Sequence, residues 1–293
     1  MKKALMIVNP RAGKNRSHGP FFEAAAELSE AGYLLQIHRT TGRGDAACMA
    51  EALGPTVDLV VCAGGDGTLN ETISGLMALE QKPLLGYLPA GSTNDFAASL
   101  HLSSNPVEAA RTAAGGTPTP IDVGWHNGRY FSYVASFGAF TKASYSAPQA
   151  VKNRLGHLAY ILQGIGSLDS LRPYRMTVEA DGERFEGEFI FGGICNSTSL
   201  GGVMKLDPAQ VEMNDGLFEM LLLEMPHSPA DFQTLISALL KMHYDAPGVI
   251  LRHVERVHIA TQDDVPWSLD GEFAPSAPEV EVRNLHSAVR LML

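Results

Sequence analysis

Residues 57–71 read VDLVVCAGGDGTLNE and contain the pattern that decides the fold. Residues 57–62 are apolar except for Asp58, which predicts a strand buried on both faces, and 68–79 predict the helix that follows. The glycines between them let a ligand approach the backbone, and a helix N-terminus attracts phosphate. Asp66 would repel that phosphate unless a divalent cation lay between them. The stretch therefore predicts a site for nucleotide phosphate and Mg²⁺.

Two other interpretations of this stretch explain less. The dinucleotide-binding fingerprint fails because Asn70 stands where its third glycine belongs. A tight strand-to-helix turn with Asp66 as a helix cap accounts for the carboxylate, but not for the glycines around it.

The same alternation of strand and helix extends outward through residues 1–124. Further apolar runs predict strands at 4–8, 34–38 and 84–88. Helical patterns lie at 21–30, 45–53, 94–100 and 107–114. Strands this apolar are typical of a parallel sheet covered by helices. We therefore expect residues 1–124 to form an α/β domain with a mainly parallel sheet.

The pattern changes near residue 121. Strands are predicted at 130–134, 176–180, 183–191 and 217–223, and Asp181-Gly182 between two of them is a hairpin signal. Helical patterns interrupt them at 155–168 and 230–242. Residues 125–285 are therefore expected to form a mainly antiparallel β domain. A last strand at 286–293 would return to either domain and could complete the sheet of the first.

The composition of the 293 residues excludes several classes of protein. With 22 Lys and Arg against 32 Asp and Glu, the net charge is −10, which argues against binding nucleic acid over a broad face. No apolar run approaches the ~18 residues of a spanning helix. Cys48, Cys62 and Cys195 lie too far apart for a disulfide framework or a zinc knuckle. We expect a cytoplasmic protein.

Two more loops after predicted strands carry residues suited to phosphate. Gly13 and Lys14 follow the first strand, but the loop lacks the first glycine of a Walker A motif, and Asn15 replaces its Ser or Thr. Lys14 would neutralise phosphate or lie solvated in its loop. Ser92 and Thr93 follow the fourth strand and would cap the next helix or bind phosphate, with capping favoured.

Four segments together resemble the diacylglycerol kinase catalytic family, in its soluble bacterial lipid-kinase branch. They are NPRAGK at 9–14, GGDGTLNE at 64–71, PAGSTNDFA at 89–97 and DGE at 270–272. By itself the last is typical of an exposed hairpin turn, and the second is shared with NAD kinases. The resemblance covers nearly the whole chain. It implies ATP at the loops of the α/β domain, a C-terminal β-sandwich and an active site in the cleft between them.

The resemblance also implies roles for single residues. Glu272 matches the general base of the family, and Asp66 would lie at the Mg²⁺–phosphate site, with Asp95 and Asp122 organising the metal and its waters. Asp215 matches a second, structural Mg²⁺ site, completed by backbone oxygens near Glu212 and Leu217. The positions that match ATP contacts are Asn9, Pro10, Arg11, Ala12, Gly13, Lys14, Thr40, Gly64, Gly65, Gly67, Thr68, Asn70, Glu71 and Ser92.

Two positions depart from the family pattern. Threonine is more usual where Ser92 stands, and serine keeps the hydroxyl. An arginine often follows the 94–97 segment, where this chain has Ala98. The second departure removes a contact to phosphate or to the lipid headgroup, so it affects which lipid is accepted.

The expected function is that of an ATP- and Mg²⁺-dependent kinase for a lipid hydroxyl such as that of diacylglycerol. A kinase for a non-lipid hydroxyl on the same scaffold is the first alternative. A nucleotide-binding regulatory protein with little turnover is the second, and the intact Asp66 and Glu272 argue against it. A lipid at the membrane surface is the expected partner, nucleic acid is not, and a homodimer is expected from the resemblance alone.

One segment has a charge opposite to that of the chain. Residues 139–175 carry Lys142, Lys152, Arg154, Arg172 and Arg175 against a single acid, together with apolar residues. Such a segment would dock peripherally on anionic lipid, or it would be an ordinary helix packed on the core. In the other helical segment, apolar residues recur at helical spacing, which favours packing in the core or in a dimer over membrane contact. They are Phe232, Leu235, Ile236, Leu239 and Leu240.

Overall fold

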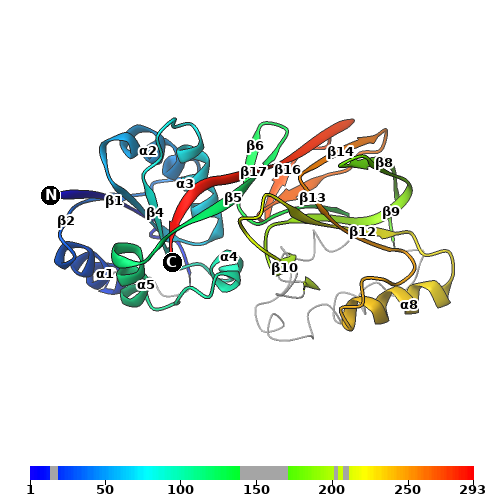
Figure 1. Ribbon diagram of the computed structural model, residues 1–293, viewed down its shortest axis with the longest axis horizontal. Coiled ribbons are helices and arrows are strands. Elements are labelled where there is room, and N and C mark those ends of the chain that lie inside the picture. The colour runs from blue at the N-terminus through cyan, green and yellow to red at the C-terminus, as the bar shows by residue number, and fades with distance from the viewer. Residues whose placement is uncertain (14–18, 139–170, 201–203, 207–210) are drawn as a thin grey trace. The chain divides into compact units, whose positions relative to one another are not determined.

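The computed structural model describes residues 1–13, 19–138, 171–200, 204–206 and 211–293. The chain forms two compact units, Met1–Val123 with Leu285–Leu293, and Gly124–Asn284 (Figure 1). Strands β5 (Pro118–His126) and β17 (Glu279–Met292) each contribute residues to both units. Lys14 and most of the basic segment at 139–175, including the helix expected at 155–168, lie outside the described residues.

The first unit is built on a parallel sheet. Its strands β1 (Lys2–Val8), β2 (Tyr33–Arg39), β3 (Leu59–Gly64) and β4 (Leu84–Pro89) lie in the order β4-β3-β1-β2. Every residue of β3 is buried, as expected for a central strand covered on both faces. Leu291 of β17 pairs in parallel with Leu85 of β4, so the last strand of the chain joins this sheet.

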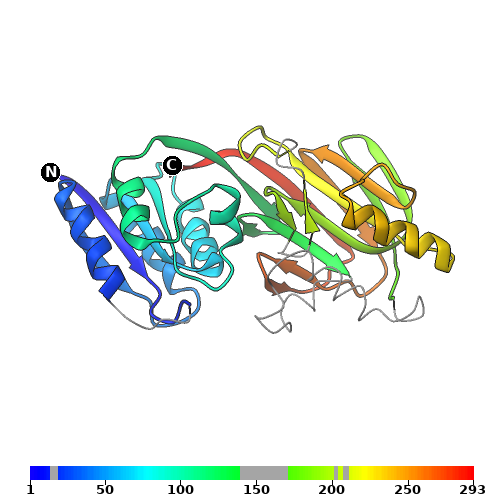
Figure 2. The ribbon, with the colours of Figure 1, turned by 90° about the horizontal axis from the view of Figure 1, so that it is seen from below.

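Helices cover both faces of this sheet. α1 (Gly19–Glu30) and α5 (Pro106–Gly115) pack together on one face (Figures 1 and 2). α2 (Asp45–Leu53) and α3 (Asp66–Met77) pack together on the other. A 3-10 turn η1 (Gly54–Thr56) follows α2, and the short helix α4 (Asp95–Ser99) follows the loop after β4. The predicted α/β class with a mainly parallel sheet is confirmed.

The second unit consists mainly of antiparallel strands. One path of pairing runs through β16 (Glu272–Ala274), β15 (Trp267–Leu269), β7 (Val134–Gly138), β9 (Glu183–Cys195), β8 (Tyr174–Ala180), β14 (Arg256–Thr261) and β17. β12 (Phe218–Glu224) pairs with β9 and with β13 (Val249–Val254), and β6 (Arg129–Phe131) pairs with β5. The short strands β10 (Ser199–Leu200) and β11 (Met204–Lys205) pair with each other.

The long strand β9 connects the two groups of strands in this unit. Its first half pairs with β8, and its last residues pair with both β7 and β12. Side chains from these strands form one apolar core that includes Phe131, Phe137, Phe218 and Trp267. The predicted antiparallel β character of this half of the chain is confirmed.

α8 (Pro229–Leu240) lies alongside the strands of the second unit (Figure 2). Leu235 and Leu239 are buried, and Phe232, Ile236 and Leu240 are half-buried. This burial agrees with the core interpretation of the apolar face. In the part of the chain that the structure describes, no helix combines the length and apolar character needed to cross a membrane.

One predicted strand is interrupted, and several other strands were not predicted. The single strand predicted at 130–134 is two strands, β6 and β7, interrupted at Ser132 and Tyr133. The interruption arises because Ser132, Tyr133 and Val134 donate their backbone N–H groups to the Asp270 carboxylate, over 100 residues away, at 2.5, 3.0 and 3.0 Å. The strands at 118–126, 249–261, 267–274 and 279–285 were not predicted because polar residues and prolines interrupt their apolar pattern.

Candidate active site

Four loops follow the parallel strands of the first unit. The carboxyl ends of parallel strands meet at one edge of a sheet, and open α/β sheets bind their ligands at that edge. The loops here are 9–13 after β1, 40–44 after β2, Gly65 after β3 and 90–94 after β4. They contain most of the residues predicted to contact ATP.

Asn9 joins the loop after β1 to the start of α3. Its Nδ2 donates to Thr68 Oγ1 at 2.8 Å, and its backbone N–H donates to the Ala63 carbonyl at 2.9 Å. Its Oδ1 accepts from the Arg11 backbone N–H at 2.9 Å, which folds the loop into a turn. Pro10, Arg11, Ala12 and Gly13 form that turn.

Glycines allow the loops after β1, β3 and β4 to approach one another closely. A Cβ on Gly91 would lie 2.6 Å from the Gly65 Cα, so neither loop has room for a side chain there. Gly13 has a φ of +72°, and a Cβ on it would lie 2.4 Å from the Ala90 carbonyl oxygen. The loops after β1, β3 and β4 therefore form one backbone surface, as a phosphate site requires.

Asp66 directly follows Gly65 of this surface and is the first residue of α3. Its carboxylate accepts from the backbone N–H groups of Asp95 and Phe96, at 3.3 and 3.4 Å. These N–H groups belong to the first turn of α4, so Asp66 connects two predicted phosphate loops and lies near a second acid. Burial raises the pKa of the Tyr87 phenol, and the charges of Asp66 and Asp95 raise it further.

The predicted cap of the helix after β4, Ser92 or Thr93, is wrong, and the alternative of Asp66 as a helix cap also fails. The N-cap of α4 is Asn94, whose φ is 54° and whose Oδ1 accepts from the Gly91 N–H at 2.8 Å; Ser92 and Thr93 are exposed. Asp66 does not cap its own helix, because Gly65 occupies the N-cap of α3 without a side-chain hydrogen bond. The carboxylate that meets the first turn of α4 comes from Asp66, which is far away in the sequence.

The remaining predicted ATP contacts lie beside this surface. Thr40 follows β2 and donates its backbone N–H to the Val8 carbonyl at 2.9 Å. Glu71 Oε1 accepts from the Gly44 N–H at the start of α2, at 2.8 Å, so one carboxylate oxygen binds a helix N-terminus. Gly64 ends β3, and Gly67 and Asn70 are half-buried in the first turns of α3.

Asp122 is fully buried in β5 and is hydrogen-bonded to the end of the chain. Its Oδ1 accepts from the Ser287 backbone N–H at 2.6 Å and lies 3.0 Å from His286 Nδ1. The Ser287 hydroxyl lies 3.2 Å from the other nitrogen of that ring. The carboxylate thus fixes the last part of β17 to β5 within the first unit.

Glu272, the predicted base, belongs to the second unit and is the first residue of β16. Its side chain is 36% exposed, and its Oε2 lies 3.9 Å from Arg129 Nη2 on β6. Arg129 Nη1 also donates to the carbonyl of Phe273 at 3.0 Å. Sequence reasoning missed Arg129, since nothing in its local sequence indicates a contact 143 residues away.

The loop at 211–217 holds the residues predicted for the structural metal. Asp215 Oδ1 accepts from the Leu217 N–H at 2.9 Å, and the Leu217 carbonyl accepts from Asn284 Nδ2 at 3.1 Å; Glu212 is exposed. Glu219 of β12 lies nearby and is 1% exposed. Burial raises the pKa of its carboxyl to about 8, and the charge of Asp215 adds to the shift. The acid near the start of the apolar run FEMLLL, at 218–223, was the signal that could have found it.

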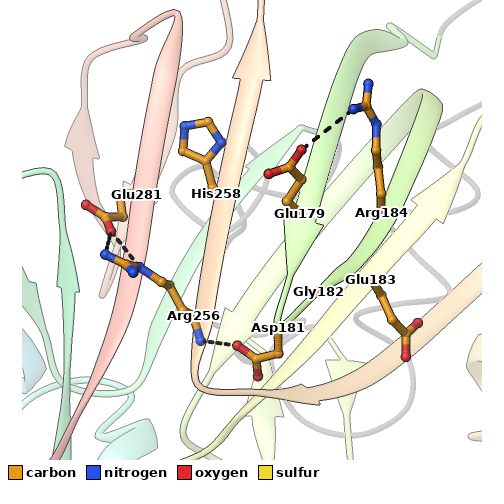
Figure 3. A pocket seen from close by; sticks show the side chains of 8 residues that line it. All are labelled: Glu179, Asp181, Gly182, Glu183, Arg184, Arg256, His258 and Glu281. Atoms are coloured by element: carbon orange, nitrogen blue, oxygen red, sulfur yellow. Dashed lines mark hydrogen bonds and ion pairs between the residues drawn. The ribbon is translucent and has the colours of Figure 1, made fainter.

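An open groove of about 620 Å³ lies elsewhere on the second unit (Figure 3). Its charges are paired: Arg184 lies 3.7 Å from Glu179, and Arg256 Nε donates to Glu281 at 2.7 Å. His258 stands between the two acids, opposite Glu179 on one strand and Glu281 on the other. None of the predicted site residues lines this groove, so it is a solvated sheet face apart from the candidate site.

Within the described ranges, no three side chains of His, Cys, Asp or Glu gather closely enough to hold a metal ion by themselves. Mg²⁺ in phosphoryl-transfer sites is usually held by one or two carboxylates together with substrate phosphates and water. Asp66 and Asp95 supply that number of carboxylates beside the glycine-rich loops.

Family models and relatives match the chain over nearly its full length. Residues 3–126 match the model "Diacylglycerol kinase catalytic domain", and residues 134–293 match the "YegS C-terminal NAD kinase beta sandwich-like domain". The chain is 35% identical over 295 residues to a diacylglycerol kinase of Bacillus subtilis (strain 168), covering 100% of this chain and 97% of the relative. A diacylglycerol kinase of Staphylococcus aureus (strain bovine RF122 / ET3-1) is 31% identical over 278 residues, or 94% and 88% of the two chains.

Solved structures agree with this likeness. A crystal structure from Bacillus anthracis str. Sterne, itself provisionally assigned as a diacylglycerol kinase, superposes with a TM-score of 0.83 at 26% identity. The superposition covers 99% of this chain and 96% of that one. The predicted C-terminal β-sandwich class is thereby confirmed. By its sequence, its fold and both matched domains, this chain belongs to the kinases of the diacylglycerol kinase catalytic-domain family.

Proposed function

We propose that the protein is an ATP- and Mg²⁺-dependent lipid kinase that phosphorylates the hydroxyl of a diacylglycerol-like acceptor. The observation that carries this proposal is the backbone surface made by the loops after β1, β3 and β4 around Asp66. Family membership gives the reaction class, and the relatives named diacylglycerol kinase suggest the acceptor.

In this proposal the first unit binds ATP. The N-terminus of α3, whose N-cap is Gly65, offers backbone N–H groups and a positive dipole end to phosphate oxygens. The Asn9 turn, Thr40 and Ser92 would line the same edge of the sheet, and Lys14 would add positive charge. The nucleotide-binding domain is then 1–124, and 125–285 would complete the lipid site.

The donor set fits a hard divalent cation. Asp66 and Asp95 provide carboxylate groups beside the phosphate loops, and the Asp66 carboxylate accepts backbone N–H groups at 3.3 and 3.4 Å. When bound there, Mg²⁺ would neutralise the charge that develops on the transferred phosphoryl group. Asp122 would support this site from β5. Asp215, with carbonyl oxygens near Leu217 and Glu212, would form a separate structural site.

Glu272 is the proposed general base. A lipid hydroxyl is a weak nucleophile, so a carboxylate within hydrogen-bond reach speeds the reaction by accepting its proton. The hydroxyl oxygen forms a bond to the γ-phosphorus as the bond to the bridging oxygen of ADP breaks. The hydroxyl proton passes to the Glu272 carboxylate.

The acceptor would be met at a membrane surface on the cytoplasmic side. The basic segment at 139–175 is the proposed contact with anionic lipid, and a homodimer is part of the proposal by family likeness. Replacing Lys152 and Arg154 by Glu should weaken sedimentation with phosphatidylglycerol vesicles. Unchanged sedimentation would remove this segment from the proposal.

The test is ATP turnover with Mg²⁺ against a panel of micellar acceptors, comparing wild type with Glu272→Gln. The panel holds diacylglycerol, monoacylglycerol, phosphatidylglycerol, ceramide, sphingosine and glycerol. We expect phosphorylation of diacylglycerol that is lost in the Gln variant. Turnover on glycerol alone would favour a non-lipid acceptor, and ATP binding without any turnover would favour a regulatory protein. Full activity of the Gln variant would exclude Glu272 as the base.

A further inference from the structure

The turn before Glu272 has a backbone that side chains rarely adopt. Asp270 and Gly271 connect β15 to β16 with φ values of 48° and 85°. Two consecutive positive φ values define the tight two-residue hairpin turn that Asp-Gly favours. Leu269 and Glu272 pair directly across it, so Glu272 leaves the turn at a fixed point.

The Asp270 carboxylate fixes this turn to another part of the second unit. The side chain is 5% exposed and accepts backbone N–H groups from three consecutive residues, 132–134. The Asp270 N–H donates in return to the Val134 carbonyl at 2.9 Å. A buried carboxylate that accepts several N–H groups is held firmly, because each lost bond leaves a desolvated charge.

The short strand that begins at Glu272 is attached to its neighbours at further points. Among the described strands, β16 comes last in the order of pairing, is three residues long and pairs with β15. Arg129 provides a second attachment, through the Phe273 carbonyl and the 3.9 Å contact with Glu272. The contacts of Asp270 and the contacts of Arg129 both involve the segment 129–134. This segment therefore supports Glu272 from β6 and from the residues that follow β6.

We propose that Asp270 is a positioning residue for Glu272, and that its contacts with 132–134 set the place of that carboxylate. The proposal rests on the proposed function of Glu272 as general base. A general base works when it lies within hydrogen-bond reach of the proton it accepts, and small displacements of reacting groups lower rates steeply. Loosening the turn at Asp270 should therefore slow the transfer step while ATP binding in the first unit stays intact.

The chain supplies its own control. Asp181-Gly182-Glu183 is a second tight turn of the same sequence, with φ values of 45° and 92° at Asp and Gly. Its Asp carboxylate also accepts backbone N–H groups, from Glu255 and Arg256 at 2.7 and 3.0 Å. The matched variant Asp181→Asn removes a similar contact at a turn that holds no proposed catalytic group.

The experiment compares Asp270→Asn, Asp181→Asn, Glu272→Gln and the double variant Asp270→Asn/Glu272→Gln, with diacylglycerol as acceptor. For Asp270→Asn we expect kcat to fall about 10- to 100-fold with little change in KM for ATP. Asp181→Asn should keep the wild-type kcat. In the Glu272→Gln background the Asp270→Asn change should have almost no further effect, since the group that it positions is gone.

Three results would overturn the inference. One is full activity of Asp270→Asn while Glu272→Gln is inactive. Another is an equal fold-loss for Asp270→Asn with and without Glu272, which would mean that the two residues act independently. The third is an equal loss of kcat in Asp181→Asn. If Glu272→Gln is itself fully active, the proposed base fails, and that outcome is distinct from the three above.

A second pair of variants serves if Asp270→Asn does not fold. Gly271→Ala keeps the carboxylate and its bonds but strains the turn, and a Cβ there meets nothing within 4 Å. Gly182→Ala is the same change at the control turn, also with nothing within 4 Å. We expect Gly271→Ala to lower kcat and Gly182→Ala to leave it unchanged. Equal kcat values in the two variants would contradict the proposal.

Discussion

The tripeptide Asp-Gly-Glu occurs twice in the second unit, at 181–183 and 270–272, and both copies form the same tight turn. In both, the Asp carboxylate accepts backbone N–H groups from a distant connection. The copies differ in their surroundings: Asp181 is exposed, and Asp270 is 5% exposed. Glu183 pairs with Arg252 at 2.9 Å on a solvated sheet face, whereas Glu272 is half-buried and lies 3.9 Å from Arg129.

This comparison separates the local structure that the tripeptide specifies from the role that its surroundings in the fold give it. The tripeptide specifies a turn and a carboxylate contact, and it does so in both places. The proposed chemistry at Glu272 comes from its position in the fold and from the other motifs of the family. A short motif therefore predicts local structure more safely than it predicts function.

The largest expected difference between the copies is in activity. Glu272→Gln should lower kcat about 100- to 10,000-fold, the usual contribution of a general base, because the amide cannot accept the hydroxyl proton. Glu183→Gln should leave kcat within experimental error. Steady-state kinetics on diacylglycerol with saturating ATP measures both. Similar rate losses in the two variants would remove the functional difference between the turns.

The next difference is in stability. Asp270→Asn should lower the free energy of unfolding by about 2 to 3 kcal/mol, because it removes the charge and replaces one of the two buried accepting oxygens by an NH2 donor that faces a backbone N–H. Asp181→Asn, at an exposed turn, should lower it by about 1 kcal/mol or less. Urea denaturation of both variants measures these losses. Equal losses would show that burial does not distinguish the two contacts.

Acid should lower the free energy of unfolding through a buried histidine beside β15, the strand that leads into the turn at 270–272. His126 is 3% exposed, and the centroid of its ring lies 4.7 Å from the centroid of the Trp267 ring in β15. Burial lowers its pKa from 6.5 to about 4, so the folded protein holds the neutral ring. The stability from this shift is present above pH 6.5 and is lost as pH falls toward 4.

The expected size of this pH effect is about 2 kcal/mol between pH 7 and pH 5. His126→Phe keeps an aromatic ring beside Trp267 but does not titrate, so it should lose less stability over the same range. Urea denaturation of wild type and variant at both pH values gives the difference. The same pH dependence in both proteins would contradict a buried neutral histidine.

The smallest difference is expected at the glycines. Gly271→Ala and Gly182→Ala should each cost about 1 kcal/mol of unfolding free energy, because both turns need a positive φ. Since φ is 85° at one and 92° at the other, the two losses should agree. Thermal or urea unfolding of the pair checks the claim that the turns share one backbone geometry. Losses that differ by more than the experimental error would show that they do not.

Much of the fold was accessible from local patterns. The short apolar run at 57–62 predicted a buried strand, because strands of a parallel sheet covered on both faces read as continuous apolar runs. The glycine-rich loops were predicted in the same way, from the glycines that come directly after such apolar runs. The second unit was harder to predict, because strands such as β13 and β14 alternate with exposed Arg and His residues.

The candidate site depended on contacts between distant residues. Asp66 binds the N–H groups of α4, Glu71 binds the start of α2, and Asp122 binds residues 164 and 165 positions away. No local pattern predicts such pairs. The roles assigned to these residues through family likeness stay predictions, as do the metal sites at Asp66 and Asp215.

The most direct test of the account is transfer of label from [γ-³²P]ATP to diacylglycerol in mixed micelles, with and without Mg²⁺. The account predicts labelled phosphatidic acid that requires Mg²⁺ and disappears in Asp66→Asn. An absence of labelled lipid from a wild-type protein that still binds ATP would contradict it.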